Sequence, residues 1–142
     1  MKIAAGRYEA DDDPERVDLD VVCHFLSTDA YWHRWRARAD IERQVRNAWR
    51  VVGVYDDDGS QVGFARAISD GVSDAYLADV FVLEAHRGNG LGALLVSAMV
   101  EEGPGDRFTW TLFTRDAHGL YQRFGFQPPD RRVLVRPGNL GT

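Results

Sequence analysis

Three glycines alternate with other residues in the segment Arg87-Gly88-Asn89-Gly90-Leu91-Gly92. Glycine has no side chain, so the backbone N–H groups of such a segment can approach a ligand closely. A helix that begins here adds partial positive charge, which favours an anion such as a phosphate group. The segment is therefore the first candidate for a binding site. The alternative is that these glycines only form a tight turn between a strand and a helix.

Two nucleotide-binding motifs also contain closely spaced glycines. Gly88, Gly90 and Ala93 fit the dinucleotide fingerprint, but that fingerprint follows the first strand of its fold and precedes an acidic residue about 20 positions later. Here at least two predicted strands come before the segment, and the next strand ends in Phe113-Thr114 without an acid. A P-loop requires a Lys-Ser or Lys-Thr pair after its glycines, and this segment has none. We therefore favour neither motif.

A single carboxylate, Asp79, interrupts the otherwise apolar segment 75–83. A buried carboxylate is costly unless it is paired or used in chemistry, so Asp79 is a candidate general base. An equally good alternative is a structural role, in which the carboxylate accepts hydrogen bonds from backbone amides where two strands diverge.

These candidate residues need helices and strands to hold them in place, and the apolar periodicity predicts both. Helical spacing begins at Leu19, after Asp18 as the N-cap, and recurs in residues 40–48, from Leu91 to about Gly103, and in 117–124. Segments rich in β-formers lie at 49–55, 61–68, 75–83, 108–114 and 131–136. This order predicts an α/β (α+β) fold built on one mixed sheet.

Composition excludes several classes of protein. The chain has 142 residues, which predicts one domain, 1–142, because a domain of this size buries a sizeable core. Its 17 Lys and Arg against 22 Asp and Glu give a net charge of −5, which disfavours binding to nucleic acid. The longest nearly apolar stretch, 91–100, is too short to cross a membrane, so we expect a cytoplasmic protein. One Cys and four scattered His predict neither a disulfide framework nor a zinc site.

The glycine segment resembles the signature of the GNAT superfamily of acetyl-CoA-dependent N-acetyltransferases, which is Gln or Arg, two residues, Gly, one residue, then Gly or Ala. A second block agrees, because such families end with a small residue, a Tyr and a Gly-Phe pair, here Ala117, Tyr121 and Gly125-Phe126. Residues 76–82 and 116–121 also look like a little-characterised bacterial branch. The resemblance covers roughly 49–127 and implies a mostly antiparallel sheet of about six to seven strands flanked by about four helices.

The resemblance also implies roles for particular residues. Tyr121 would protonate the departing thiolate, and the alternative is that it is a core aromatic on a helix face. The exposed main chain of Val80, Phe81 and Val82 would bind the pantetheine arm and the acetyl carbonyl. The pyrophosphate would be held by the amides that follow Arg87, which are those of Gly88, Asn89, Gly90, Leu91, Gly92 and Ala93.

Two departures from the family pattern are visible. Thr114 stands where many members have an Asn that touches the coenzyme arm, so that contact would be made by a hydroxyl. The proline that is common shortly before the loop is missing, and Glu84 and Ala85 lie in that stretch.

The activity implied by the resemblance is transfer of an acetyl group from acetyl-CoA, as co-substrate, to a primary amine by direct attack on the thioester, without a metal. The rival hypothesis is a non-catalytic acyl-CoA-binding module. We expect the acceptor to be a small-molecule or protein amine, and the chain to be a monomer or homodimer. Tyr31, Trp32 and Trp35 either form a loop that gates the acceptor or pack on the sheet, with the neighbouring arginines in water.

Overall fold

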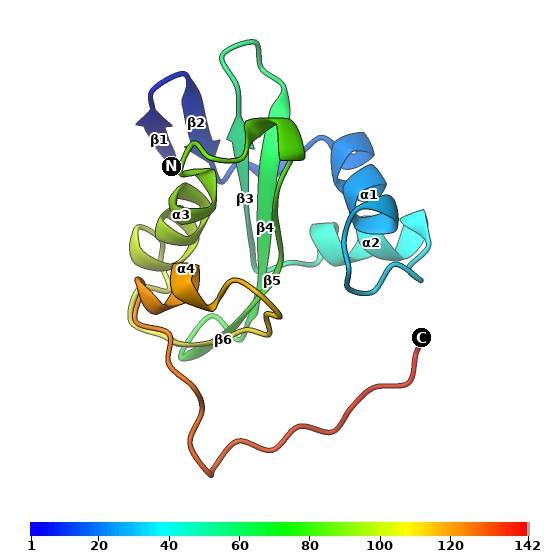
Figure 1. Cartoon of the computed structure of the whole chain (residues 1–142), viewed down its shortest axis with the longest axis vertical. Helices are drawn as coiled ribbons and strands as arrows, with labels where there is room; N and C mark the ends of the chain where they lie inside the picture. The colour runs from blue at the N-terminus through cyan, green and yellow to red at the C-terminus, as the bar shows by residue number, and fades with distance from the viewer. Residues whose placement is uncertain (142) are drawn as a thin grey trace.

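A six-stranded sheet runs through the computed structural model, which describes residues 1–141 (Figure 1). The strands follow one another in space in the order of the sequence. The first five pair antiparallel, and the last two pair parallel. They are β1 (Lys2–Ala5), β2 (Tyr8–Asp11), β3 (Arg50–Tyr55), β4 (Gln61–Ser69), β5 (Asp74–Val82) and β6 (Thr109–Thr111).

Helices accompany this sheet on both sides. The α-helices of the described residues are α1 (Leu19–Thr28), α2 (Arg38–Arg46), α3 (Leu91–Val96) and α4 (His118–Gln122). α3 continues into a π-helix, η3 (Ser97–Glu101), and short 3₁₀ turns precede α1 and α3 as η1 (Pro14–Arg16) and η2 (Glu84–His86). The predicted fold, a mixed and mostly antiparallel sheet flanked by four helices, is confirmed.

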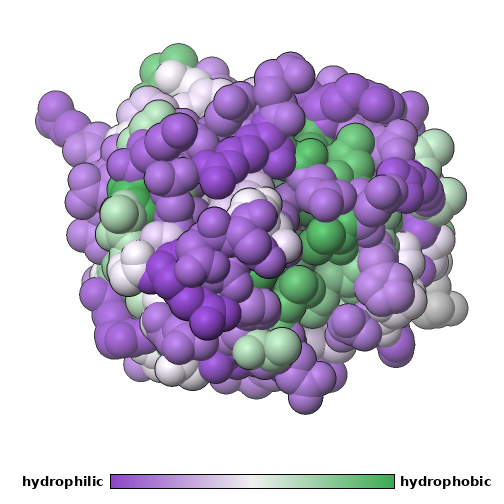
Figure 2. Space-filling model, turned by 90° about the horizontal axis from the view of Figure 1, so that it is seen from above, coloured by the Kyte–Doolittle hydropathy of each residue, from purple (hydrophilic) through white to green (hydrophobic). Residues whose placement is uncertain are grey.

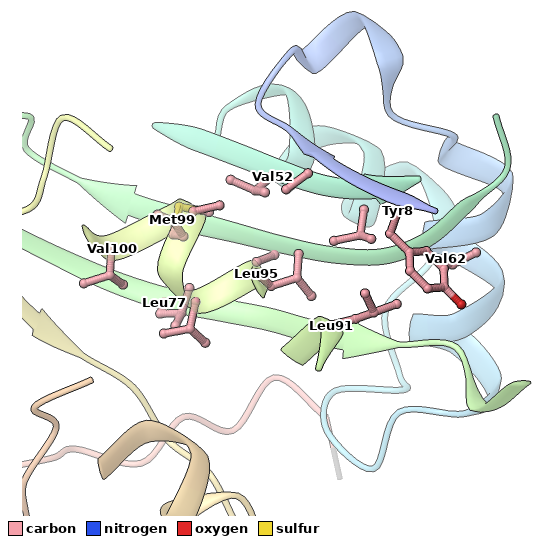
Figure 3. Packing of buried hydrophobic residues seen from close by; sticks show 14 of the residues in the cluster. Tyr8, Val52, Val62, Leu77, Leu91, Leu95, Met99 and Val100 are labelled. Atoms are coloured by element: carbon pink, nitrogen blue, oxygen red, sulfur yellow. The ribbon is translucent and has the colours of Figure 1, made fainter. Parts of the chain in front are cut away.

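Two apolar cores lie on opposite faces of the sheet, because alternate residues of a strand point to opposite sides. Val51 of β3 packs with α1 and α2, whereas its neighbour Val52 packs with α3. Leu95 and Met99, on α3 and η3, lie over the strands of this second face (Figure 3). Seen from above, the surface is mostly hydrophilic, with an apolar patch near the middle of the view (Figure 2).

The hairpin of β1 and β2 was not predicted from the sequence. Its turn contains Gly6 at a φ of +61°, a left-handed conformation that glycine adopts without steric cost. Each strand has only four residues, and the first is largely exposed. These strands are ordered by pairing with β3 rather than by a strong local pattern, because β-propensity depends on the neighbouring strands.

β6 is shorter than predicted. The sequence pattern of 108–114 indicates a strand, but only Thr109–Thr111 pairs with β5. The pairing ends where Tyr76 lies opposite Thr111, and β5 continues along β4 without β6. Residues 112–114 therefore have no ladder partner, and the two strands open a gap that becomes part of the site.

The predicted strand at 131–136 is wrong. This segment forms no strand, and Val133, Leu134 and Val135 are exposed. After α4 the chain leaves the sheet and runs below it toward α2 (Figure 1). Residues of high β-propensity form a strand only where a neighbouring strand supplies hydrogen-bond partners, and the tail has none.

Replacing a leucine by alanine once in the core and once in the tail tests whether the tail is free of core packing. We expect Leu95→Ala to lower the free energy of unfolding by about 3 kcal/mol, because it leaves a cavity in the core. Leu134→Ala should change it by less than about 0.5 kcal/mol, because that side chain is 93% exposed. Urea denaturation measures both values, and a large effect at Leu134 would contradict the exposed tail.

Candidate active site

The glycine segment forms an open loop between β5 and α3. Gly88 and Gly90 have φ angles of +82° and +74°, which strain any other residue. A Cβ added to either glycine would meet no atom within 4 Å, so the backbone here borders open space. Gly90 is the N-cap of α3, and no side chain in residues 1–141 caps that helix start. The amides of the first turn are thus free to bind an anion.

Side chains of the same segment hold the loop in shape. Arg87 Nε donates a hydrogen bond to the carbonyl of Val82 at 3.1 Å, and Asn89 Nδ2 donates to the carbonyl of His86 at 2.9 Å. Leu91 points into the core. A Cβ on Gly92 would approach Leu120 of α4 to 3.4 Å, so this glycine permits close helix packing. Arg87 and Asn89 are exposed themselves, and they flank the uncovered backbone of the two glycines.

β5 contains an irregularity at Asp79. Phe64 pairs with Phe81, but Arg66 pairs with Ala78, so two residues of β5, Asp79 and Val80, lie opposite Ala65 alone. This is a β-bulge, and Asp79 has a φ of +53°. A non-glycine residue in this conformation costs roughly 1 kcal/mol or more, so other contacts must stabilise it.

The Asp79 carboxylate accepts hydrogen bonds from three side chains. Oδ1 accepts from Trp32 Nε1 at 2.6 Å and from Arg36 Nη2 at 3.0 Å. Oδ2 accepts from Arg36 Nη1 at 2.9 Å and from Arg66 Nε at 2.6 Å. Burial alone would raise the pKa of Asp79, but the hydrogen bonds and charges of the two arginines outweigh it and lower the pKa to about 2.

This arrangement bears on the two roles considered for Asp79. Each carboxylate oxygen already accepts two hydrogen bonds, and a group with a pKa of about 2 is a weak base at neutral pH. The role as general base stays a prediction, and the geometry favours the structural alternative. The donors are side chains rather than the backbone amides we expected.

The gap between β5 and β6 opens into a cavity of about 540 Å³. Of the predicted site residues, Asp79, Val80, Thr114 and Tyr121 line it together. Phe81 does not, because its side chain stacks on Phe25 in the core at a ring distance of 4.0 Å. The cavity therefore brings together Tyr121, the bulge at Asp79 and Val80, and Thr114.

Tyr121 comes from α4 and is almost fully buried. Burial, with smaller contributions from Tyr31 and Asp116, raises its pKa to about 12, so the phenol keeps its proton at neutral pH. Its ring also meets Phe126 edge to face. Tyr121 therefore packs in the core, as expected of an aromatic on a helix face, and it also lines the cavity.

Thr114 ends the unpaired stretch after β6. Its Oγ1 accepts a hydrogen bond from the Ala117 amide at 3.1 Å, which fixes the turn before α4. The hydroxyl proton is left to donate to a ligand, so the departure from Asn preserves a polar group at this wall of the cavity.

The aromatic loop between α1 and α2 forms the opposite wall. Tyr31 and Trp35 are partly exposed there, and Tyr31 Oη accepts a hydrogen bond from the Arg115 amide at 3.0 Å. The Arg115 guanidinium lies 3.8 Å from the centre of the Tyr31 ring. At the mouth, Gly141 lies against Trp35. The loop contacts both the sheet, through Trp32, and the segment after β6, through Tyr31.

Sequence reasoning missed the arginines that bind Asp79. The packing alternative for the aromatic loop placed the neighbouring arginines in water, but Arg36 is buried, with Nη1 also bonded to Gln44 at 2.8 Å. Arg66 was passed over within a predicted strand. A signal existed, because Arg66 and Asp79 are opposite charges in consecutive apolar strands joined as a hairpin.

Other features of residues 1–141 add little to this site. A second cavity, of about 680 Å³, lies near Asp12, Arg50 and Pro104 and contains none of the predicted site residues. In the described part of the chain, no three or more His, Cys, Asp or Glu gather in a way that could hold a metal ion. No helix there is long and apolar enough to span a bilayer.

Comparisons with known proteins agree with the geometry. The Acetyltransferase (GNAT) domain family matches residues 48–128. A crystal structure of a protein from Xanthomonas campestris pv. campestris, assigned to the GNAT family of acetyltransferases, superimposes with a TM-score of 0.87. The two chains are 34% identical, and the match covers 95% of this chain and 96% of that one.

Two more distant relatives follow. A Deinococcus radiodurans protein described as an acetyltransferase shares the fold with a TM-score of 0.68 and 22% identity, over 94% of this chain and 92% of that one. A curated Gibberella zeae protein, also described as an acetyltransferase, is 27% identical over 113 residues, which is 68% of this chain. The match spans 64% of the length of that fungal relative.

Asp79→Asn tests the buried charge cluster. We expect it to lower the free energy of unfolding at pH 7 by about 3 kcal/mol, because two buried arginines lose their counter-charge. Because the folded-state pKa of Asp79 lies below its ordinary value, its stabilisation is present above about pH 4 and is lost as the pH falls towards 2. The difference in free energy of unfolding between wild type and variant, measured by urea denaturation, should therefore shrink over that pH range.

Asp70→Asn is the matched control. Asp70 also has a pKa of about 2, caused by hydrogen bonds from the amides of Ser73, Val72 and Asp74, but it lies in an exposed turn far from the cavity. It should alter acid stability without altering acetyl transfer. Turnover by folded Asp79→Asn protein equal to wild type would remove Asp79 from proton transfer altogether.

Proposed function

The chain belongs to the GNAT acetyltransferase family, and on this premise we propose that it transfers the acetyl group of acetyl-CoA to a primary amine. One observation carries the proposal: an open glycine loop with free amides follows β5, and a cavity lined by a protonated tyrosine lies where β5 and β6 diverge. The loop suits a diphosphate and the cavity suits a reacting centre.

The residues present fit acetyl-CoA as co-substrate. The amides of 88–93 would hold the pyrophosphate, because the left-handed glycines leave them uncovered. The edge of β5 from Val80 to Val82 has no partner from β6, so its main chain can bond the pantetheine arm. The Thr114 hydroxyl supplies a further donor at the cavity wall. When bound, acetyl-CoA supplies the thioester carbonyl that an amine attacks.

Tyr121 is proposed as the acid for the leaving sulfur. Its phenol is protonated at neutral pH, lines the cavity and is shielded from bulk water. A buried donor stabilises a developing thiolate more strongly than an exposed one, because the local dielectric is low. The neighbouring Tyr31 is 41% exposed, so its phenol is less well shielded from bulk water than that of Tyr121.

The attacking amine must lose a proton, since an alkylamine is almost wholly protonated at pH 7. We propose that water in the cavity accepts this proton rather than Asp79, whose oxygens are engaged by Trp32, Arg36 and Arg66. The cavity is open enough to hold such water.

Tyr121→Phe tests the acid and separates an enzyme from a binding module. We expect kcat to fall by about 10²- to 10⁴-fold, because the hydroxyl proton is lost, while acetyl-CoA binding is retained. Release of free thiol with a panel of amines measures turnover, and calorimetry measures binding. Wild-type protein that binds acetyl-CoA but releases no thiol with any amine would favour the binding module.

Tyr55→Phe is the matched control for that variant. Tyr55 is also buried, with its pKa likewise raised to about 12 by burial, but it does not line the cavity and its hydroxyl has no hydrogen-bond partner among residues 1–141. The same deletion should leave turnover unchanged. A loss of turnover in this control as large as that in Tyr121→Phe would contradict a specific role for Tyr121.

Gly90→Ala tests the loop. The substitution strains a left-handed residue and sets a methyl group on the face where the amides are free, so we expect the Kd for acetyl-CoA to rise by 10-fold or more. Gly59→Ala is the control, because Gly59 has a φ of +87° with open space at its Cβ, but lies in the β3–β4 turn. Calorimetry should show weaker binding only for Gly90→Ala.

A further inference from the structure

Arg66 is a buried arginine whose hydrogen-bonding capacity is only partly used. It lies on β4, and its side chain is 9% exposed. Nε donates to Asp79, but the two terminal nitrogens have no hydrogen-bond partner within residues 1–141. Arg66 lines the cavity, and in the described chain only the Tyr55 hydroxyl is both fully enclosed and without a hydrogen-bond partner. The terminal nitrogens of Arg66 are therefore accessible from the cavity. Four N–H donors therefore remain for a ligand.

Arg36 provides the contrast within the same cluster. Its Nε donates to the His33 carbonyl at 3.1 Å, and both of its terminal nitrogens are engaged by Asp79, with Gln44 as an additional acceptor. Arg36 thus neutralises Asp79 and fixes the loop after α1. Arg66 is the cation that the single carboxylate leaves without a full counter-charge.

The charge balance of the cluster favours an anionic ligand. Two buried arginines share one carboxylate, so the cluster carries a net positive charge. Arg115 and Asp116, which also line the cavity, offset each other. A buried charge without a partner is costly, and a protein of net charge −5 has no general reason to collect positive charge here. A ligand oxyanion would compensate it.

The residues that line the cavity beside Arg66 indicate the chemistry of the rest of the ligand. Tyr76 lies on β5, diagonally across the ladder from Arg66, and Trp32 and Trp35 face the same cavity from the loop after α1. These aromatic surfaces suit an apolar body of modest size, given a cavity of about 540 Å³.

We propose that Arg66 binds an oxyanion of the acetyl acceptor, so that the acceptor is an amine bearing a carboxylate or phosphate-like group on an apolar body. The planar guanidinium matches such a group with two parallel hydrogen bonds. This inference rests on the proposed acetyl transfer, and it makes Arg66 the residue that determines acceptor specificity.

The test compares amines that differ only in the anion. Phenylalanine, its carboxamide and its aminophosphonate analogue are offered with acetyl-CoA, and kcat/KM is measured by thiol release. We expect the carboxylate or the phosphonate to exceed the carboxamide by about 10- to 100-fold. Amine basicity acts in the opposite direction, because the carboxamide has more neutral amine at pH 7. Equal or better use of the carboxamide would overturn the inference while leaving acetyl transfer intact.

Variants of Arg66 locate the effect. Arg66→Met should abolish the preference, and Arg66→Lys, which keeps a charge beside Asp79 but lacks the planar fork, should reduce it while the protein stays folded. Arg43→Met is the control, because Arg43 is an exposed arginine of α2 outside the cavity, and it should keep the preference. An undiminished preference in both Arg66 variants would overturn the proposal.

A binding measurement separates this inference from the proposed activity. Titration calorimetry with N-acetylphenylalanine and its carboxamide needs no turnover. Tighter binding of the carboxylate by wild type, lost in Arg66→Met, supports the oxyanion site even if no amine is acetylated, a result that would overturn the proposed function alone. Equal binding of the two probes by wild type overturns the site.

Discussion

The bonding of one buried carboxylate to two arginines and a tryptophan is the constraint on which the site depends. Asp79 lies in a strained left-handed bulge of β5, and its oxygens tie that bulge to Arg66 on β4 and to Trp32 and Arg36 on the loop after α1. Two adjacent strands and a loop 43 to 47 positions earlier in the sequence thereby share one anchor. Without it, the arginines would be buried charges without a counter-ion, and the loop that forms the far wall of the cavity would lose its hydrogen bonds to β5.

The two faces of the sheet have different proposed roles around this anchor. On one face, α3 packs on β3 and β4 and presents the glycine loop, where a coenzyme diphosphate is proposed to bind. On the other, α1, α2 and their connecting loop present aromatic rings and arginine nitrogens toward the proposed acceptor. The gap between β5 and β6 connects the two sides. Coenzyme and acceptor can therefore approach the same point from opposite directions.

Local signals predicted much of this arrangement. The Asp18 cap of α1, the hairpin of β3 and β4, and the glycine loop before α3 are each encoded within a few residues. Partnerships between distant segments were out of reach, since Arg36 and Asp79 are 43 positions apart and no periodicity links them. The strand predicted at 131–136 failed for the complementary reason: its composition suits a sheet, but strand formation requires a neighbour that the fold does not provide.

β6 has a further consequence for how the cleft behaves. Only three residue pairs join it to β5, whereas β4 and β5 are paired along nearly their whole length. The least securely bonded edge of the sheet is thus also the border of the cleft, although Trp110 of β6 packs against the core that contains α3. Fraying at this border can widen the cleft for bulkier guests at the cost of that contact, so the breadth of ligands admitted and the resistance of this edge to hydrogen exchange are set by the same few bonds.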